Sequence, residues 1–203
     1  MTHLRTVIKL LCFAIAFALV SPLIALSFLE KHVIRTSGIF ATCSQIVSLV
    51  PGPIGHYVRA AFYFGSLDSC SWQTHIGFGS IFVHRGCQIS RNFSTGSYCV
   101  IGHLSVGSGV RMASRVSVPS GKRQHLDDSG AISGETHFDQ VSIGSGCWIG
   151  EGAIVMADVG PDSIVSAGAV VLKVMPASSL VGGNPATVIR NLAGDVPHGA
   201  DKA

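Results

Sequence analysis

The chain has 203 residues and a formal net charge of +3, with 12% charged residues and 24 glycines. This length suits one domain with an appendage. The charged share is about half of the usual value, which argues against a disordered chain. The mild positive charge does not imply a polyanionic partner, so we expect no nucleic-acid binding.

Six cysteines are spread along the chain without a C-x-x-C pair, and no histidine cluster has zinc-finger spacing. A disulfide framework is not expected at this length and spacing. We therefore expect reduced thiols that pack as small apolar side chains, and no metal site. The cysteines are Cys12, Cys43, Cys70, Cys87, Cys99 and Cys147.

The first element in chain order is an apolar segment from Leu10 to Leu29, a run of 20 residues without a charge. A transmembrane helix needs about 20 such residues. Basic residues flank the segment nearly equally, so the positive-inside rule does not decide its orientation. We predict that residues 1–35 form a membrane-anchor helix. The alternatives are a cleaved signal peptide, with Leu10 to Val20 as its apolar region, and a buried soluble helix.

Residues 36–69 follow as an apolar linker that Pro51-Gly52-Pro53 divides in two. Gly38 to Val50 carries no charge and is too short to span a membrane comfortably. Ile54 to Leu67 mixes apolar and aromatic residues, so we expect an amphipathic helical linker that lies along the membrane interface. A helix packed on the following domain is the alternative.

From about Ile76 the apolar residues recur with a period of six, which fits neither a helix nor a simple strand. A fixed period is the signature of a solenoid, in which stacked coils bury a continuous apolar column. We expect this domain at residues 70–190, followed by a flexible tail at 191–203. The inward residues of the repeat are Val100, Val106, Met112, Val118, Ile143, Ile149 and Val155, with Val83 and Ile89 in an earlier, less regular stretch.

The repeat is interrupted between Val118 and Val141 by the sequence PSGKRQHLDDSGAISGETHFDQ. A loop that leaves a solenoid is where function is usually carried. This insertion contains two histidines, His125 and His137, together with several carboxylates. It is therefore the first place to look for catalytic groups.

The run from Ile143 to Ala186 reads IGSGCWIGEGAIVMADVGPDSIVSAGAVVLKVMPASSLVGGNPA. It resembles the C-terminal half of hexapeptide-repeat acyltransferases, with sugar and polysaccharide O-acetyltransferases as the nearest kind. The resemblance covers about residues 76 to 190. It implies a left-handed parallel β-helix with three hexapeptides per coil, and a homotrimer with active sites between subunits. Its most specific residues are Trp148, Ala167-Gly168, Lys173, Pro176 and Gly183-Asn184-Pro185-Ala186.

In similar enzymes a histidine of this insertion is the general base that takes the proton of the acceptor hydroxyl. A sugar hydroxyl is a weak nucleophile at neutral pH, and imidazole titrates near that pH. We assign this role to His125, although many relatives have their histidine slightly earlier, where Arg123 stands. His137 is the second candidate, and His84 and His103 follow. Two carboxylates are candidates for orienting the base, namely Asp128 and Glu135.

The resemblance also implies acetyl-CoA as the acyl donor and carries its binding residues over position by position. Ala167 and Gly168 match a pair that lets the backbone approach the pantetheine arm. Lys173 and Arg190 match basic residues that meet the CoA phosphates through charge-assisted hydrogen bonds. Trp148 matches a tryptophan beside the active site, and a packing role at a corner is its alternative.

These features predict an acetyl-CoA-dependent O-acetyltransferase that transfers an acetyl group directly to a hydroxyl of a saccharide or a lipid-linked sugar. The expected partners are a small-molecule or glycan acceptor, further copies of the chain in a homotrimer, and a membrane at the N-terminus. Because acetyl-CoA is cytosolic, we expect the catalytic domain on the cytoplasmic face. The alternatives are a non-catalytic β-helix scaffold and a metal-dependent enzyme of the carbonic-anhydrase kind, since His84 and His103 lie about one coil apart.

Overall fold

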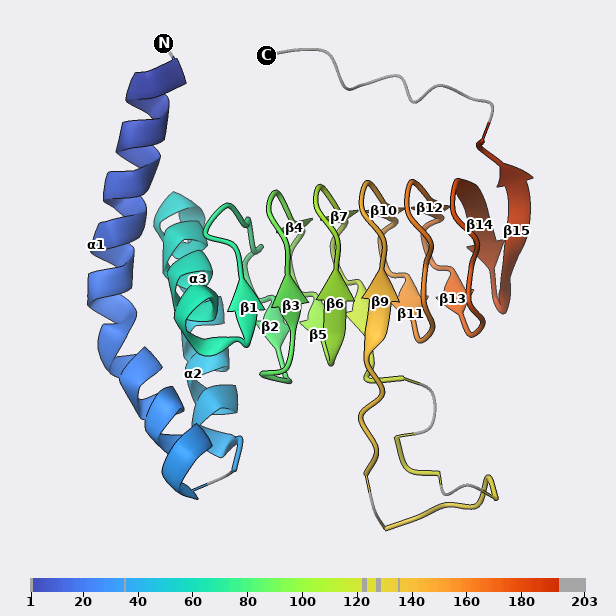
Figure 1. Cartoon of the computed structure of the whole chain (residues 1–203), viewed down its shortest axis with the longest axis horizontal. Coiled ribbons are helices and arrows are strands. Elements are labelled where there is room, and N and C mark those ends of the chain that lie inside the picture. Colours follow the sequence, from blue (N-terminus) through green and yellow to red (C-terminus); the bar gives the residue numbers. More distant parts are fainter. Residues whose placement is uncertain (1, 35, 122–123, 127–128, 135, 194–203) are drawn as a thin grey trace.

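The computed structural model describes residues 2–34, 36–121, 124–126, 129–134 and 136–193. In this part of the chain, helices cover one end of a long solenoid built from short strands (Figure 1). The helical elements are α1 (Thr2–Leu29), a π-helical turn (Glu30–Ile34), α2 (Gly38–Ser48) and α3 (Gly52–Ser66). Most of the expected tail, residues 194–203, lies outside the described residues.

The solenoid has three faces, and each face is a sheet that successive coils extend by one parallel strand. The first sheet contains β1 (Ser69–Cys70), β3 (Gln88–Ile89), β6 (Leu104–Val106) and β9 (Val141–Ile143). The second contains β4 (Ser94–Thr95), β7 (Arg111–Met112), β10 (Trp148–Ile149), β12 (Ile164–Val165), β14 (Ser179–Gly183) and β15 (Ala186–Asn191). The third contains β2 (Ile81–Phe82), β5 (Val100–Ile101), β8 (Ser117–Val118), β11 (Ile154–Val155) and β13 (Val170–Val171).

The ladder between coils confirms the expected parallel β-helix. Its register pairs Ser69 with Gln88, nineteen positions on, and Trp148 with Ile164, sixteen positions on. Strand β7 pairs with β10 although the insertion separates them in sequence, so the insertion leaves the ladder unbroken. Antiparallel β15 pairs with β14 and closes the C-terminal end of the second sheet.

The predicted period of six residues between inward side chains is correct for most of the solenoid. In the first coils, two of the predicted inward residues are off by one position. Phe82 and Ile101 point inward and are at most 1% exposed, whereas the predicted Val83 and Val100 are 46% and 43% exposed. The cause is the length of the turns. The turn after Phe82 is one residue longer than a period of six requires, and the turn after Ile101 is one residue shorter. The inward column is nevertheless continuous from Ile76 to Val181.

The cysteines pack as small apolar residues, as the sequence predicts. All six are free, and every one except Cys12 is buried. Cys87, Cys99 and Cys147 lie on the inward column with at most 1% exposure. Burial raises the pKa of Cys87 to about 12, so its thiol stays protonated at neutral pH.

Helices α2 and α3 close the N-terminal end of the solenoid through buried polar contacts. The Tyr63 hydroxyl lies 2.7 Å from Ser44 Oγ and accepts a hydrogen bond from Phe82 N, while Ser44 Oγ donates to Phe82 O at 3.0 Å. The fully buried guanidinium of Arg59 donates to main-chain oxygens of Ser48, Val50 and Ile76. These bonds join both helices to the first coil, which agrees with the alternative of a helix packed on the domain.

Helix α1 lies against α3 at the same end of the solenoid (Figure 1). The ring centroids of Phe13 and Phe17 are 5.5 and 6.0 Å from that of Phe64. The segment Leu4–Val33 contains an 18-residue window with a mean hydropathy of 2.5, and it is long and apolar enough to cross a membrane. The same length and composition also occur in signal sequences, so they suggest membrane association only weakly.

Candidate functional site

The insertion, residues 119–140, leaves the solenoid between β8 and β9 and projects away from it (Figure 1). Its base is held by main-chain contacts. Asp139 N donates to Ser120 O at 3.1 Å, and the buried Ser120 Oγ accepts a hydrogen bond from His103 N at 2.9 Å. Farther out, Leu126 and Ile132 form an antiparallel bridge. The insertion therefore begins and ends at a fixed point beside His103.

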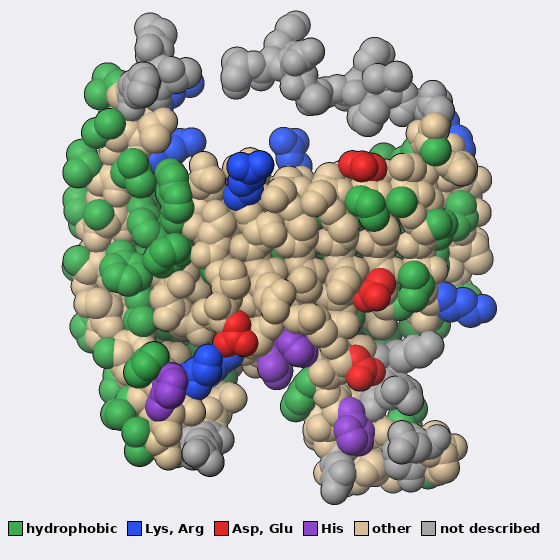
Figure 2. Space-filling view, in the orientation of Figure 1, with side chains coloured by type: hydrophobic (Ala, Val, Ile, Leu, Met, Phe, Trp, Pro, Cys, Tyr) green, Lys and Arg blue, Asp and Glu red, His purple; other side chains and the backbone are tan. Residues whose placement is uncertain are grey.

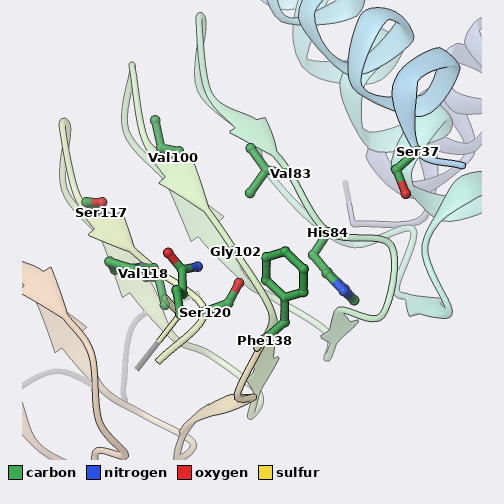
Figure 3. A pocket seen from close by; sticks show the side chains of 11 residues that line it. Ser37, Val83, His84, Val100, Gly102, Ser117, Val118, Ser120 and Phe138 are labelled. Atoms are coloured by element: carbon green, nitrogen blue, oxygen red, sulfur yellow. The ribbon is translucent and has the colours of Figure 1, made fainter. Parts of the chain in front are cut away.

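A pocket of about 360 Å³ lies on the N-terminal side of this base (Figure 3). Apolar side chains of the third sheet form its floor, and the phenyl ring of Phe138 and the imidazole of His84 stand at one side (Figure 3). These two rings have centroids 5.4 Å apart. The lining residues are Ser37, Val83, His84, Val100, Gly102, Ser117, Val118, Pro119, Ser120, Gln124 and Phe138.

His84 and His103 stack at this corner with ring centroids 4.4 Å apart. Gly86 N donates to His84 Nδ1 at 3.0 Å, so the proton of the neutral ring sits on Nε2. His103 Nδ1 lies 3.3 Å from Phe138 O, and its Nε2 lies 3.2 Å from the amide nitrogen of Gln140. In the neutral tautomer that fits these partners, Nδ1 donates to Phe138 O and Nε2 accepts from Gln140.

The electrostatics of the pair favour the neutral form of His84. Burial lowers the pKa of His84, repulsion from His103 lowers it further, and the carboxylate of Asp68 opposes both effects. A stacked pair of imidazoles cannot hold two positive charges without repulsion. His84 is therefore uncharged at neutral pH and has a lone pair at Nδ1 that the main chain already uses.

The structure places His125 on the insertion as an exposed side chain. Its neighbour Gln124 lines the larger pocket, and Gln124 O accepts a hydrogen bond from His137 N at 2.9 Å. The two histidines of the insertion are thus brought close together in the backbone. Three residues of the sequence-based site lie outside the described residues, namely Asp128, Glu135 and Arg123.

A second pocket, of about 210 Å³, lies on the C-terminal side of the insertion. Lys173 lines it from the turn after β13, and Asp158 lines it from the turn one coil earlier. Asp158 Oδ1 accepts a hydrogen bond from Ser142 N at 2.7 Å, so this carboxylate is held in place. The insertion therefore stands between a mostly apolar pocket lined by the imidazole of His84 and a smaller pocket lined by Lys173.

Ala167 and Gly168 occupy another corner of the solenoid, between the second and third sheets, and both are exposed. Gly168 has a φ of +67°, and nothing lies within 4 Å of the position that a Cβ would take. Gly168 N donates to Glu151 O of the preceding coil at 2.8 Å. The preceding coil has Gly152 at the same turn position, with φ +68° and equally open space. Two successive turns therefore present bare backbone.

The same turn position is a glycine, Gly79, in the first coil and carries side chains in the next two coils. It is occupied by Tyr98 and then by Arg115, each with a φ of +59°. Arg115 forms an exposed ion pair with Glu151, and the ring of Tyr98 covers Gly79. The change from side chains to glycine thus occurs at the level of β10, where the motif Ile143 to Ala186 begins to form coils.

The remaining two residues of the predicted donor site lie on the second sheet. Trp148 begins β10 and is 52% exposed, so it faces outward rather than filling a core corner. Arg190 lies on β15, in register with Leu180 of β14, and is exposed. The five predicted donor residues therefore share the C-terminal coils but not one pocket, because Lys173 and Gly168 are on opposite edges of the third sheet.

Sequence reasoning missed Phe138 and Gln140, which contact the histidine pair from the C-terminal end of the insertion. No periodicity marks either residue, because the insertion has none. Only their position in the sequence could have identified them. Both residues directly precede β9, so they must lie near the corner at which the insertion leaves the solenoid. Within the described ranges, no group of three His, Cys, Asp or Glu side chains is arranged to hold a metal ion.

No family model matches the chain. It is 30% identical over 112 residues to a Schizosaccharomyces pombe protein named "Putative acetyltransferase", over 54% of this chain and 53% of that protein. It is 41% identical over 59 residues to a Staphylococcus aureus protein of the same description, over 28% of this chain and 30% of that protein. The chain thus spans about half the length, or less, of the curated relatives it matches.

The solved maltose O-acetyltransferase from Clostridium difficile is similar in three dimensions, with a TM-score of 0.69 over 81% of this chain and 90% of that one. The two sequences are 19% identical, so this likeness concerns the fold. The predicted resemblance is thereby confirmed: in fold over most of its length, and in sequence over about half of it, the chain is similar to hexapeptide-repeat acetyltransferases.

Proposed function

We propose that the chain is an acetyl-CoA-dependent O-acetyltransferase that acts on a hydroxyl of a saccharide or a lipid-linked sugar. The observation that carries the proposal is the bare corner at Gly152 and Gly168, in coils whose sequence resembles the C-terminal half of hexapeptide-repeat acyltransferases. An extended pantetheine arm needs backbone it can approach closely, and glycine provides it. Lys173 and Arg190 supply positive charge in the same C-terminal coils for the CoA phosphates.

In the proposed reaction, the imidazole of His125 takes the proton of the acceptor hydroxyl as the hydroxyl oxygen bonds to the thioester carbonyl carbon. The carbon–sulfur bond then breaks. The sulfur leaves as a thiolate and takes the proton back from the imidazolium, so CoA departs as a free thiol and the acceptor as an ester. Exposure of His125 and its place next to Gln124 at the larger pocket support this assignment. Asp128 and Glu135 are proposed to orient the base.

We place this site between two copies of the chain in a homotrimer. Within one chain, the bare corner lies at one edge of the third sheet, whereas the insertion leaves the solenoid at the opposite edge. One copy therefore offers a donor corner at one edge and a base at the other. A site that needs both takes them from two copies, and rotational symmetry then repeats the arrangement around a closed ring.

The N-terminal helix is proposed to hold the enzyme at the cytoplasmic face of a membrane, where the acceptor would be a sugar in polysaccharide biosynthesis. The support is the apolar segment Leu4–Val33, which contains an 18-residue window with a mean hydropathy of 2.5. Ser37, which follows this segment closely, lines the larger pocket. A lipid-linked sugar would thus meet the pocket near the membrane-facing end of the solenoid.

The test uses the purified full-length chain in detergent, with acetyl-labelled CoA and a panel of sugar and lipid-linked sugar acceptors. Loss of a general base costs about 10²- to 10⁴-fold in rate, and we expect this loss in kcat for His125→Ala. His32→Ala is the matched control, because His32 lies on the π-helical turn and lines neither pocket. A full rate for His125→Ala would contradict the base assignment. Failure of the wild-type chain to bind CoA by calorimetry would contradict the whole proposal.

A further inference from the structure

Helix α1 has two faces with different surroundings. The side chains that pack inward are Phe13, Ala16, Phe17, Val20, Leu23, Ile24, Ser27 and Glu30, which recur every three or four residues. The opposite face carries Leu11, Ile15, Leu19, Leu26 and Leu29, each between 47% and 69% exposed. Figure 2 shows apolar side chains covering this flank of the molecule. Both faces are apolar, but only one of them has a protein partner in the chain.

The inner face is fixed to the solenoid near both ends of the charge-free run. Near its start, Phe13 contacts the ring of Trp72 in the first coil with centroids 6.1 Å apart. Near its end, the fully buried Glu30 forms an ion pair with Arg85, which lies between β2 and β3. Seventeen residues separate these two attachments, which is about 26 Å of helix.

This attachment is incompatible with α1 crossing a bilayer. The charge-free run would have to lie in the hydrocarbon, and the first coil would have to enter it alongside. That coil exposes Gln73 and His75 as well as the ion pair between Lys31 and Asp68, whose side chains are each 47% exposed. Exposed polar and charged groups of this kind do not lie in the hydrocarbon region. The helix also runs across the end of the solenoid rather than along its axis (Figure 1).

We propose that α1 lies in the plane of the membrane and inserts its outer face into one leaflet, without spanning the bilayer. The occupant of the outer face is lipid, because that face is uncharged from Leu10 to Leu29 and the segment has the hydropathy of a membrane span. Exposed Arg5 and Lys9 precede the run and suit anionic headgroups. This inference rests on the proposed membrane attachment and specifies its geometry: the solenoid stands on the membrane with β15 as its far end.

The first test is the sidedness of the two ends of the chain. Cys12→Ala removes the one cysteine that is not buried, and Thr6→Cys, off the outer face, or Thr187→Cys then adds a single label site at either end. Both label sites are exposed in the fold. An impermeant maleimide applied to inverted vesicles and to intact cells should label both positions from the same side. Labelling from opposite sides would show a spanning helix and overturn the proposal.

The second test is release from the membrane. The double variant Ile15→Gln/Leu19→Gln changes the outer face only, and Val188→Gln/Ile189→Gln on β15 makes the same change at the far end of the solenoid. The soluble fraction should rise at least tenfold for the first variant, with an unchanged circular dichroism spectrum, and stay unchanged for the second. A first variant that stays with the membrane would contradict the outer-face contact. A soluble wild-type chain that turns over acetyl-CoA would overturn membrane attachment alone, whereas a membrane-bound chain without turnover would overturn the chemistry alone.

Discussion

At the scale of single residues, a buried charge pair joins the N-terminal helices to the solenoid. The Glu30 carboxylate accepts hydrogen bonds from Ile39 N at 2.7 Å, Phe40 N at 2.9 Å and Thr36 Oγ1 at 2.9 Å, and it pairs with Arg85. The guanidinium of Arg85 also lies 4.9 Å from the centre of the Phe40 ring. A buried charge is tolerated when every lone pair has such a partner. The sequence alone showed Glu30 only as a flank of an apolar run.

Removing one member of this pair should strongly destabilise the fold. Glu30→Ala leaves the Arg85 guanidinium buried without its carboxylate, and we expect a loss of about 3–5 kcal/mol in the free energy of unfolding. Lys31→Ala is the control, since its pair with Asp68 is half exposed and is worth about 0–1 kcal/mol. Urea denaturation in detergent measures both. Equal losses of unfolding free energy in the two variants would show that burial of the pair has no special effect. The double variant Glu30→Ala/Arg85→Met should recover part of the free energy that Glu30→Ala loses.

At the scale of elements, the strands were predictable and the corners were not. A two-residue strand with one inward side chain repeats every sixth residue, so Ile143, Ile149 and Val155 are identified from spacing alone and are at most 2% exposed. Spacing fails where a corner gains or loses a residue, as it does after Phe82 and after Ile101. The proposed functional residues lie in the turns, and the residues that contact them belong to other coils. Spacing along the sequence therefore does not identify these contacts.

The bare corner should be sensitive to any added side chain. Gly168→Val places a β-branched side chain where φ is +67° and where the acyl donor is proposed to lie. We expect KM for acetyl-CoA to rise about tenfold, equivalent to about 1.4 kcal/mol of binding, with a smaller change in kcat. Gly109→Val is the matched control, because Gly109 has φ +74° and open space but lies on another corner in an earlier coil. Steady-state kinetics measure both, and equal KM values for the two variants would rule out a donor corner at Gly168.

At the scale of the whole molecule, the proposed functional regions lie at different positions along the axis of the solenoid and at different edges of its sheets. Helices close the N-terminal end, the antiparallel strand β15 closes the other end, and the insertion projects from one corner between two pockets (Figure 1). The donor corner and the insertion lie at opposite edges of the third sheet. This separation is the structural reason for proposing a site shared between copies.

A shared site should show complementation between inactive copies. At acetyl-CoA concentrations well below KM, His125→Ala and Gly168→Val chains should each be weakly active alone, and mixed trimers should recover activity because some sites combine an intact base with an intact donor corner. Random mixing of equal amounts leaves about one quarter of such sites fully intact. The measurement is turnover after unfolding and joint refolding, or after coexpression with two tags. Activity no higher than the mean of the two separate variants would place the whole site within one chain.

The amino-acid sequence by itself determined the solenoid, because a strict period leaves one way to bury its apolar residues, namely by stacking coils around a continuous column. It also determined the free, packed cysteines and the place of the insertion. Only the tertiary structure decided what the corners hold: the stacked pair of His84 and His103, the contacts of Phe138 and Gln140 with that pair, and the attachment of α1 to the first coil. These contacts join residues that are up to 59 positions apart, as in Phe13 and Trp72, and a local sequence pattern does not indicate such neighbours.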